Sequence, residues 1–255
     1  MNKKIISYCK QIEQEHQIKI IFAVESGSRL WRMSSKDSDY DVRFVFVQPW
    51  ENYLSVKNEA TTNLVINRTF EQGMIDISGF DIFKYCKLLL KSNPSVIEWL
   101  QSDILYYGKK PADLQKIALK EFSPIALYYH YKSMCQYNYQ KYLASKQEVT
   151  YKKYLYAMRG LVNAKYVQKT GELPPIHFPE GLEKSKDILP LKIIRELQET
   201  IKLKMEGNEK EIIKNNPLYD DYIEVFLKQE NEKVPIRKIN EEKINKALQK
   251  LLLRR

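Results

Sequence analysis

Two strand-like segments near the N-terminus limit the folds open to this chain. Residues 19–24 (KIIFAV) are a short run rich in β-branched and aromatic side chains, which predicts a buried strand. Residues 40–48 (YDVRFVFVQ) alternate between apolar and polar side chains, which predicts a second strand, closed by Pro49. Gly27-Ser28 interrupts the pattern between them, and a polar loop of residues 34–38 follows. The chain must therefore contain a sheet with a glycine-containing break after its first strand.

Hydrophobic periodicity divides the rest of the chain into a mixed half and a helical half. In the first half we predict helices at residues 2–16, 81–91 and 95–100, and further strands at residues 60–70 and 73–78. After about Gly108 the pattern is almost entirely helical, interrupted by a proline-rich loop at residues 173–181. The candidate helices there span residues 111–122, 124–145, 150–170, 190–206, 209–214, 218–229 and 241–254. We therefore expect an α+β fold, with a mixed sheet and flanking helices in residues 1–108 and a helical domain in residues 109–255.

Composition restricts the class of protein. Apolar residues make up 44% of the 255, which is enough for a packed core and too many for a disordered chain. No apolar run reaches about 18 residues, and residues 1–11 lack the apolar stretch of a signal peptide, so we expect a cytoplasmic protein without membrane contact. The three cysteines are scattered without metal-ligand spacing, which argues against a disulfide framework and a zinc ribbon.

The formal net charge of +10 is concentrated in the second part of the chain. Residues 1–100 carry 13 Lys and Arg against 12 Asp and Glu, whereas residues 101–255 carry 29 against 20. Residues 126–170 hold 8 basic residues, one acidic residue and 10 of the 18 tyrosines. This mixture suits a polyanion, because cations meet phosphates and rings stack on bases. The alternative interpretation is a tyrosine-rich helical core with a solvated lysine face.

Acidic residues at the start of the second strand indicate the chemistry. Asp39 and Asp41 are two positions apart in a strand, so their carboxylates point to the same face. Two such charges repel and need a counter-ion, and hard oxygen ligands select Mg²⁺ or a similar ion such as Mn²⁺. A third carboxylate, Asp76, lies in the later strand. If that strand neighbours the second, the three aspartates could hold two metal ions for phosphoryl transfer.

The Gly-Ser break supplies a candidate phosphate site. Gly27 lets the backbone approach a phosphate closely, and N–H groups at a following helix start can bind an anion. Ser28 adds a hydroxyl donor. Arg29, Arg32 and Arg43 lie nearby in the sequence and could offset phosphate charge. Each part is weak evidence alone, but the ordered set of strand, Gly-Ser, ten residues, Asp-x-Asp and a third-strand aspartate is far more specific.

These motifs resemble those of a known family. The segment VESGSRLWRMSSKDSDYDVRFVFV is similar to the signature of the DNA polymerase β-type nucleotidyltransferase superfamily, and more narrowly to the RlaP family of predicted nucleotidyltransferases associated with RNA repair. The runs IDISGFDIFKYCKLLLKSNPSVIEWLQS, KKYLYAMRGLVNAKYV and LPPIHF support the narrower match. The resemblance implies metal-dependent transfer of an NMP from an NTP to an acceptor hydroxyl, with release of pyrophosphate. One departure is Arg32, where a glycine commonly follows the tryptophan.

The resemblance also implies roles for the acidic residues. The Gly-Ser pair falls on the family's phosphate-binding turn, and Asp39 and Asp41 fall on its paired metal ligands. We predict Asp76 as the third ligand and as the base for the acceptor hydroxyl; the alternative is Asp81, which better suits a cap of the next helix. Glu25 is either a carboxylate that orients side chains of the Gly-Ser turn or a strand-end charge that faces water.

One face of the predicted helix at residues 150–170 is a second candidate site. Its members are Lys152, Tyr156, Arg159 and Asn163. In one interpretation this face is a nucleotide clamp, with Tyr156 against the base and the cations, together with Lys153, on the phosphates. In the other interpretation it packs on neighbouring helices. Lys132, Gln136 and Tyr139 form a similar face on the preceding helix, with the same two interpretations.

We expect an NTP and RNA as partners, because the basic and tyrosine-rich second half offers a positive track for an RNA acceptor. The reaction would then be an RNA end repair or end addition. Two alternatives stay open: NMP transfer to a hydroxyl of a protein or small molecule, and a catalytically idle RNA-binding or antidote module. The intact Gly-Ser and Asp-x-Asp motifs argue against the idle module.

Overall fold

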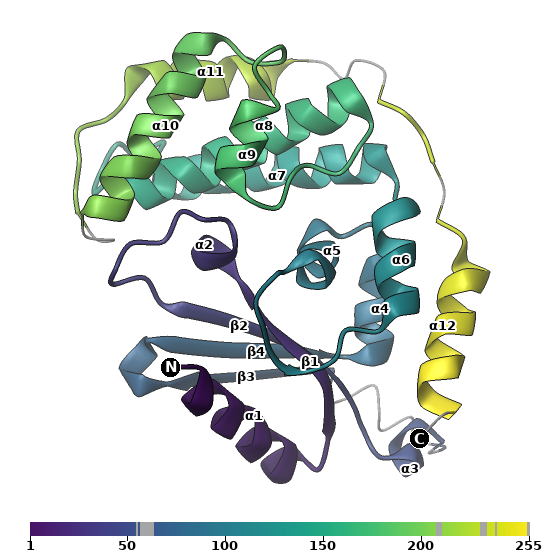
Figure 1. The fold of residues 1–255 in the computed structure, drawn as a ribbon. Helices are drawn as coiled ribbons and strands as arrows, with labels where there is room; N and C mark the ends of the chain where they lie inside the picture. Colours follow the sequence, from purple (N-terminus) through teal and green to yellow (C-terminus); the bar gives the residue numbers. More distant parts are fainter. Residues whose placement is uncertain (55, 57–63, 208–210, 230–233, 238, 254–255) are drawn as a thin grey trace. The chain divides into compact units, whose positions relative to one another are not determined.

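The protein is described by a computed structural model, which covers residues 1–54, 56, 64–207, 211–229, 234–237 and 239–253 (Figure 1). The chain forms two compact units, which we describe one at a time. Unit 1 comprises Met1–Leu30, Asp39–Glu121 and Ile239–Arg255, and unit 2 comprises Trp31–Ser38 and Phe122–Lys238. In the part of the chain that is described, no helix combines the length and the apolar character needed to cross a membrane.

Unit 1 is built on a mixed sheet that confirms the expected α+β fold. Within the described residues it has five strands in the order β3-β4-β2-β1-β5. They span Lys19–Ser26 (β1), Tyr40–Val47 (β2), Val65–Phe70 (β3), Ile75–Asp81 (β4) and Leu105–Gly108 (β5). β2 and β4 run parallel, and the other neighbours are antiparallel. Part of the strand predicted at residues 60–70 lies outside the described residues, and β3 covers the rest; the edge strand β5 was not predicted.

Helices cover both faces of this sheet. α1 places Ile5, Cys9 and Ile12 on the face that carries Phe44 and Phe46 of β2. α4 and α5 pack on the opposite face. α6, which the sequence predicted as the start of the helical half, packs on α5 and α12 and therefore belongs to unit 1. The helices of unit 1 are α1 (Asn2–His16), α2 (Gly27–Leu30), α3 (Trp50–Tyr53), α4 (Ile82–Leu90), α5 (Pro94–Gln101), α6 (Ala112–Lys120) and α12 (Glu241–Leu253).

Unit 2 is helical, as the periodicity predicted. Its helices are α7 (Pro124–Tyr142), α8 (Tyr151–Thr170), α9 (Phe178–Glu183), α10 (Leu191–Glu206) and α11 (Pro217–Lys228). α7 and α8 pack closely because Gly160 has no side chain: a Cβ there would lie 2.8 Å from the backbone nitrogen of Cys135. α9 begins within the stretch 173–181 that was predicted as a loop. Of the helix predicted at 209–214, residues 209 and 210 lie outside the described residues and 211–214 are not helical.

The loop Trp31–Ser38 is part of unit 2, although its neighbours in the chain belong to unit 1. The backbone N–H of Phe178, in α9, donates to the carbonyl of Trp31 at 3.0 Å. Lys204 of α10 is buried and donates its ammonium to the carbonyl of Met33 at 2.8 Å. The hydroxyl groups of Ser35 and Ser38, also buried, lie 2.9 Å apart. The loop is therefore held by hydrogen bonds to α9 and α10.

Candidate active site

Strands β2 and β4 carry two carboxylates that the fold brings together. In their parallel pairing, Asp41 lies directly opposite Asp76. Neighbouring strands are about 4.8 Å apart, so side chains of a register pair stand next to each other on one face. The guanidinium of Arg43 bridges them, with nitrogens 2.9 Å from Asp41 Oδ1 and 2.8 Å from Asp76 Oδ2. β4 is thus the neighbour of β2 that the sequence argument required.

The bridging guanidinium of Arg43 shows that this carboxylate pair binds a cationic group. Asp41 and Asp76 hold a positive charge between their oxygens, and carboxylate oxygens are also the ligands that Mg²⁺ prefers. The donor set therefore fits a divalent cation. The side chain of Asp39 does not join this pair as a third ligand. Among the described residues, no three His, Cys, Asp or Glu side chains form a group that could hold a metal ion. Metal binding by Asp39 stays a prediction.

The turn that follows β1 lies against Asp41. Gly27 has a left-handed backbone conformation (φ 63°), and a Cβ there would lie 1.9 Å from Asp41 Oδ2. Glycine is therefore required both by the backbone conformation and by the close approach of the carboxylate. The hydroxyl oxygen of Ser28, the next residue, is buried and has no hydrogen-bond partner in the described part of the protein. Because nearly all buried polar groups are paired, this hydroxyl is a donor that the described part of the protein does not use.

Arg29 connects this turn to the start of β2. Its Nε donates to the carbonyl oxygen of Asp39 at 2.9 Å, and its guanidinium lies 3.8 Å from the ring centre of Tyr40. Of the three arginines predicted to offset phosphate charge, Arg29 and Arg43 are in unit 1 and contact the acidic strand β2, whereas Arg32 belongs to unit 2. Their contact with a nucleotide stays a prediction.

Glu25 is fully buried, so it is not a strand-end charge that faces water. Its Oε1 accepts the backbone N–H of Asp41 at 2.9 Å, and its Oε2 accepts a hydrogen bond from the hydroxyl of Tyr106. Burial raises the pKa of Glu25 to about 7, although these two hydrogen bonds act in the opposite direction. The carboxylate thus holds the backbone of Asp41. No sequence signal pointed to Tyr106, because β5 carries no motif and reaches β1 only in the folded sheet.

Asp81, the alternative third carboxylate, has a structural role. It lies at the far end of β4 from Asp76, is fully buried, and caps α4 by accepting the N–H of Phe83 at 2.8 Å. Its other oxygen accepts the hydroxyl of Tyr53 at 2.5 Å and the side-chain amide of Gln48 at 3.2 Å. Of the two candidates, Asp76 is therefore the one placed beside Asp41.

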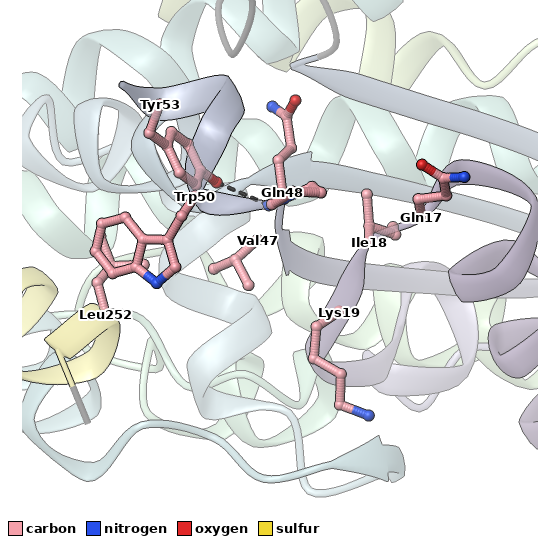
Figure 2. Close-up of a pocket in the computed structure, with 9 residues that line it drawn as sticks. Gln17, Ile18, Lys19, Val47, Gln48, Trp50, Tyr53 and Leu252 are labelled. Atoms are coloured by element: carbon pink, nitrogen blue, oxygen red, sulfur yellow. Dashed lines mark hydrogen bonds between the residues drawn. The ribbon is translucent and has the colours of Figure 1, made fainter. Parts of the chain in front are cut away.

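A separate hollow lies at the end of β2 remote from Asp41 (Figure 2). Its volume is about 380 Å³, and its walls come from the turn before β1, the end of β2, α3 and α12. Trp50 on its rim is 41% exposed, and Tyr53 connects it to the network around Asp81. None of the residues predicted for the site lines this hollow.

In unit 2 the candidate face of α8 takes part in packing. Arg159 is buried, and its guanidinium stacks on Trp31 at 3.7 Å from the ring centre. Tyr156 meets the same indole edge-on, with ring centres 5.3 Å apart. Lys152 lies 5.8 Å from the Tyr156 ring, and Lys153 donates to a backbone carbonyl at 2.6 Å. These contacts fit the packing interpretation, and the nucleotide clamp stays a prediction.

The mixed sheet of unit 1 thus sets the Gly-Ser turn against Asp41 and pairs Asp41 with Asp76 of a parallel strand. The chain belongs to the RlaP family, described as the RNA repair pathway DNA polymerase beta family, whose model matches residues 1–254. The protein is therefore an enzyme of the nucleotidyltransferase class.

Two relatives are similar in sequence. YcgL of Bacillus subtilis (strain 168) is 35% identical over 255 residues, covering 99% of this chain and 95% of that protein. MJ0002 of Methanocaldococcus jannaschii is 31% identical over 156 residues, covering 60% of this chain and 61% of that protein.

Two solved structures are more distantly similar. One is the spectinomycin adenyltransferase AAD(9) from Enterococcus faecialis with ATP and spectinomycin (TM-score 0.48, 13% identity, 89% of this chain and 99% of that chain). The other is a nucleotidyltransferase-like protein from Exiguobacterium sibiricum 255-15 (TM-score 0.31, 12% identity, 98% of this chain and 76% of that chain). At these TM-scores neither adds to the family assignment.

Proposed function

We propose that this nucleotidyltransferase moves an NMP from an NTP to a hydroxyl of RNA, with Mg²⁺ or Mn²⁺, and releases pyrophosphate. The observation that carries the proposal is the register pair of Asp41 and Asp76, which holds a cationic group beside the Gly27 turn. Such a pair suits the divalent cation that accompanies phosphate groups in phosphoryl transfer.

The reaction forms one bond and breaks another. The acceptor oxygen attacks the α-phosphorus, the bond to the oxygen that bridges the α- and β-phosphates breaks, and pyrophosphate leaves with the electron pair. The proton of the attacking hydroxyl passes to a carboxylate. Asp76 suits this role because its side chain is 36% exposed, against 19% for Asp41, so an acceptor reaches it more easily.

The remaining residues bind the nucleotide. Ser28 donates its otherwise unpaired hydroxyl to a phosphate oxygen, and Gly27 lets the turn that carries Ser28 lie directly against Asp41. Asp41 and Asp76, with Asp39 two positions before Asp41 in the chain, would hold the divalent cation, which would supply Lewis acidity and compensate phosphate charge. The guanidinium of Arg43, released from the carboxylates, then offsets phosphate charge.

Two observations support RNA as the acceptor. The description of the family to which the chain belongs names an RNA repair pathway. The basic excess also lies in residues 101–255, where 29 basic residues stand against 20 acidic ones. An RNA acceptor needs such a positive surface along its backbone.

The test is to incubate the protein with each α-labelled NTP, a divalent cation and a cell extract, and then to separate RNA, protein and small molecules. The proposal predicts label in the RNA fraction, lost when the cation is chelated and in Asp41→Asn. Label in the protein or small-molecule fraction would overturn the RNA acceptor and keep the transfer chemistry. No labelled product with any NTP, together with salt-sensitive RNA binding, would indicate an idle RNA-binding module and overturn the proposal.

A further inference from the structure

We infer that one exposed side of α7, continued by the start of α8, binds single-stranded RNA. This surface, which we call the α7 strip, consists of Tyr129, Tyr137, Lys141, Tyr142 and Lys153. The choice of RNA over other polyanions rests on the proposed function. The strip itself lies wholly within unit 2 and is distinct from the carboxylate pair of unit 1.

Two tyrosine rings are presented to solvent along α7. Tyr129 is 45% exposed and Tyr137 is 56% exposed. They are eight positions apart in the helix, which corresponds to about 12 Å along the axis. Between them the surface is hollowed, with a volume of about 530 Å³ and walls formed by side chains that recur every three or four residues from Ala126 to Asn138. The rings therefore line a shallow groove along the helix.

Lysine side chains lie among the rings at the end of this groove. The ammonium of Lys141 is 5.0 Å from the ring centres of both Tyr137 and Tyr142, and 2.6 Å from the hydroxyl of Tyr137. Lys153, at the start of α8, lies 5.9 Å from the Tyr142 ring. The groove thus ends in a cluster of two tyrosines and two lysines.

The other polar side of α7 makes contacts inside unit 2. The hydroxyl of Tyr139 donates to Glu224 at 2.7 Å, and the ammonium of Lys132 donates to the carbonyl of Gln229 at 2.9 Å. The face predicted from Lys132, Gln136 and Tyr139 is therefore at least partly structural. The exposed rings lie on a different side of the helix, which the sequence analysis did not single out.

The chemistry of the α7 strip favours a single-stranded nucleic acid. Exposed rings stack on unpaired bases, and lysine ammonium groups meet the phosphates between them. A duplex keeps its bases stacked inside and offers the tyrosines no ring to contact. Residues 126–170 carry 8 basic residues and one acidic residue, so the charge around the strip suits a polyanion.

The test measures RNA binding without NTP, so that it does not depend on transfer. A fluorescent, unstructured RNA oligonucleotide is titrated with the full-length protein at several salt concentrations, and the anisotropy is followed. We expect Tyr129→Ala and Tyr137→Ala each to weaken binding about tenfold, because each removes one stacking platform. The plot of log affinity against log salt has a negative slope, and Lys141→Ala should make this slope less steep by about 0.7. That is the value for one lost phosphate contact on a single strand.

Two matched variants control for general effects. Tyr137→Phe keeps the ring and should bind within about twofold of wild type. Lys228→Ala removes a lysine from α11, where the side chain is 81% exposed and outside the strip, and should leave the salt slope unchanged. Circular dichroism and thermal midpoints establish that all variants are folded.

The inference is overturned if wild type binds no single-stranded RNA, or if both tyrosine variants bind as wild type does. Equal competition by heparin, with no effect of the tyrosine variants, would also overturn it, because the surface would then be a purely electrostatic one. A tyrosine variant that changes the oligomeric state in light scattering would assign the strip to a second copy instead. Failure of NMP transfer with intact, tyrosine-dependent RNA binding would contradict the proposed function and leave this inference standing.

Discussion

Asp41 and Asp76 lie opposite each other on two parallel strands, and the guanidinium of Arg43 binds both carboxylates. The three residues come from strands that are separated in the sequence by β3 and adjacent in the sheet. The guanidinium places one positive charge between two negative ones and so offsets part of the repulsion between the carboxylates. A divalent cation that enters the site must compete with Arg43, and this competition gives the first prediction.

Arg43→Ala should destabilise the metal-free protein by about 1–2 kcal/mol, because it leaves two partly buried carboxylates side by side without a counter-ion. Mg²⁺ should then raise the thermal midpoint of the variant more than that of wild type, since the cation supplies the missing charge. The measurement is thermal unfolding in chelator and in Mg²⁺. Arg68→Ala on the exposed strand β3 is the control, and an equal Mg²⁺ effect in all three proteins would contradict the prediction.

Gly27→Ala should abolish detectable NMP transfer and destabilise the protein by about 2 kcal/mol or more, because the new Cβ would overlap Asp41 Oδ2 and the residue would keep a positive φ. Gly73→Ala is the matched control. Gly73 also has a positive φ, of 98°, but a Cβ there meets no atom within 4 Å. The Gly73→Ala variant should therefore lose only the stability that backbone strain costs and should retain NMP transfer. Similar losses of stability and transfer in both variants would argue against the role of the Asp41 contact.

Glu25→Gln should change how stability depends on pH. The pKa of Glu25 is raised to about 7 by burial, from 4.5, so its contribution to stability is fully present below pH 4.5 and is lost as the pH rises through about 7. Glutamine does not ionise, so the variant should gain stability relative to wild type between about pH 5 and about pH 8. Urea unfolding in chelator gives the free energies of unfolding of the variant and of wild type at both pH values. A stability difference between the two proteins that is the same at both pH values would contradict the prediction.

Arg32→Gly should stabilise the protein by about 0.5–1 kcal/mol, because Arg32 has a left-handed backbone conformation (φ 60°) that a side chain disfavours. The family resemblance led us to expect a glycine at this position, and the observed φ explains that preference. Chemical denaturation of the variant gives the free energy of unfolding. Arg32→Ala serves as the comparison, because alanine keeps the backbone strain and also lacks the guanidinium. Equal free energies of unfolding in the glycine and alanine variants would refute the backbone explanation.

The sequence predicted much of the mixed α/β half because its signals there are local. The apolar run of β1, the alternation of β2 and the Gly-Ser break between them each depend on neighbouring residues. The sequence analysis had to assume that β2 pairs with β4. The sheet order shows that these two strands are neighbours. The hydrogen bonds of Glu25 to Asp41 and Tyr106 could not be predicted, because they join three strands that no local pattern aligns.

The long helices of the helical half were predicted, whereas α9 and the non-helical residues 211–214 were not, and neither was the use of the helix faces. Arg159 and Asn163 are polar residues on one side of α8, and periodicity alone does not tell a binding face from a buried one. Both are buried in unit 2, where Trp31 covers Arg159. That contact depends on a loop far away in the sequence, which belongs to the same compact unit. The tyrosines of residues 126–170 were recognised in the sequence, but periodicity did not tell which of their rings are exposed.

The most direct test of the account is NMP transfer by Asp76→Asn compared with Asp81→Asn. Transfer is measured as label passing from an α-labelled NTP to RNA in the presence of Mg²⁺. Asparagine is also a good helix cap, so Asp81→Asn keeps the N-terminus of α4 capped and should retain transfer, whereas Asp76→Asn should lose it by about a hundredfold or more while remaining folded. Full activity in Asp76→Asn, or equal loss in both variants, would contradict the assignment of the Asp41–Asp76 pair as the catalytic centre.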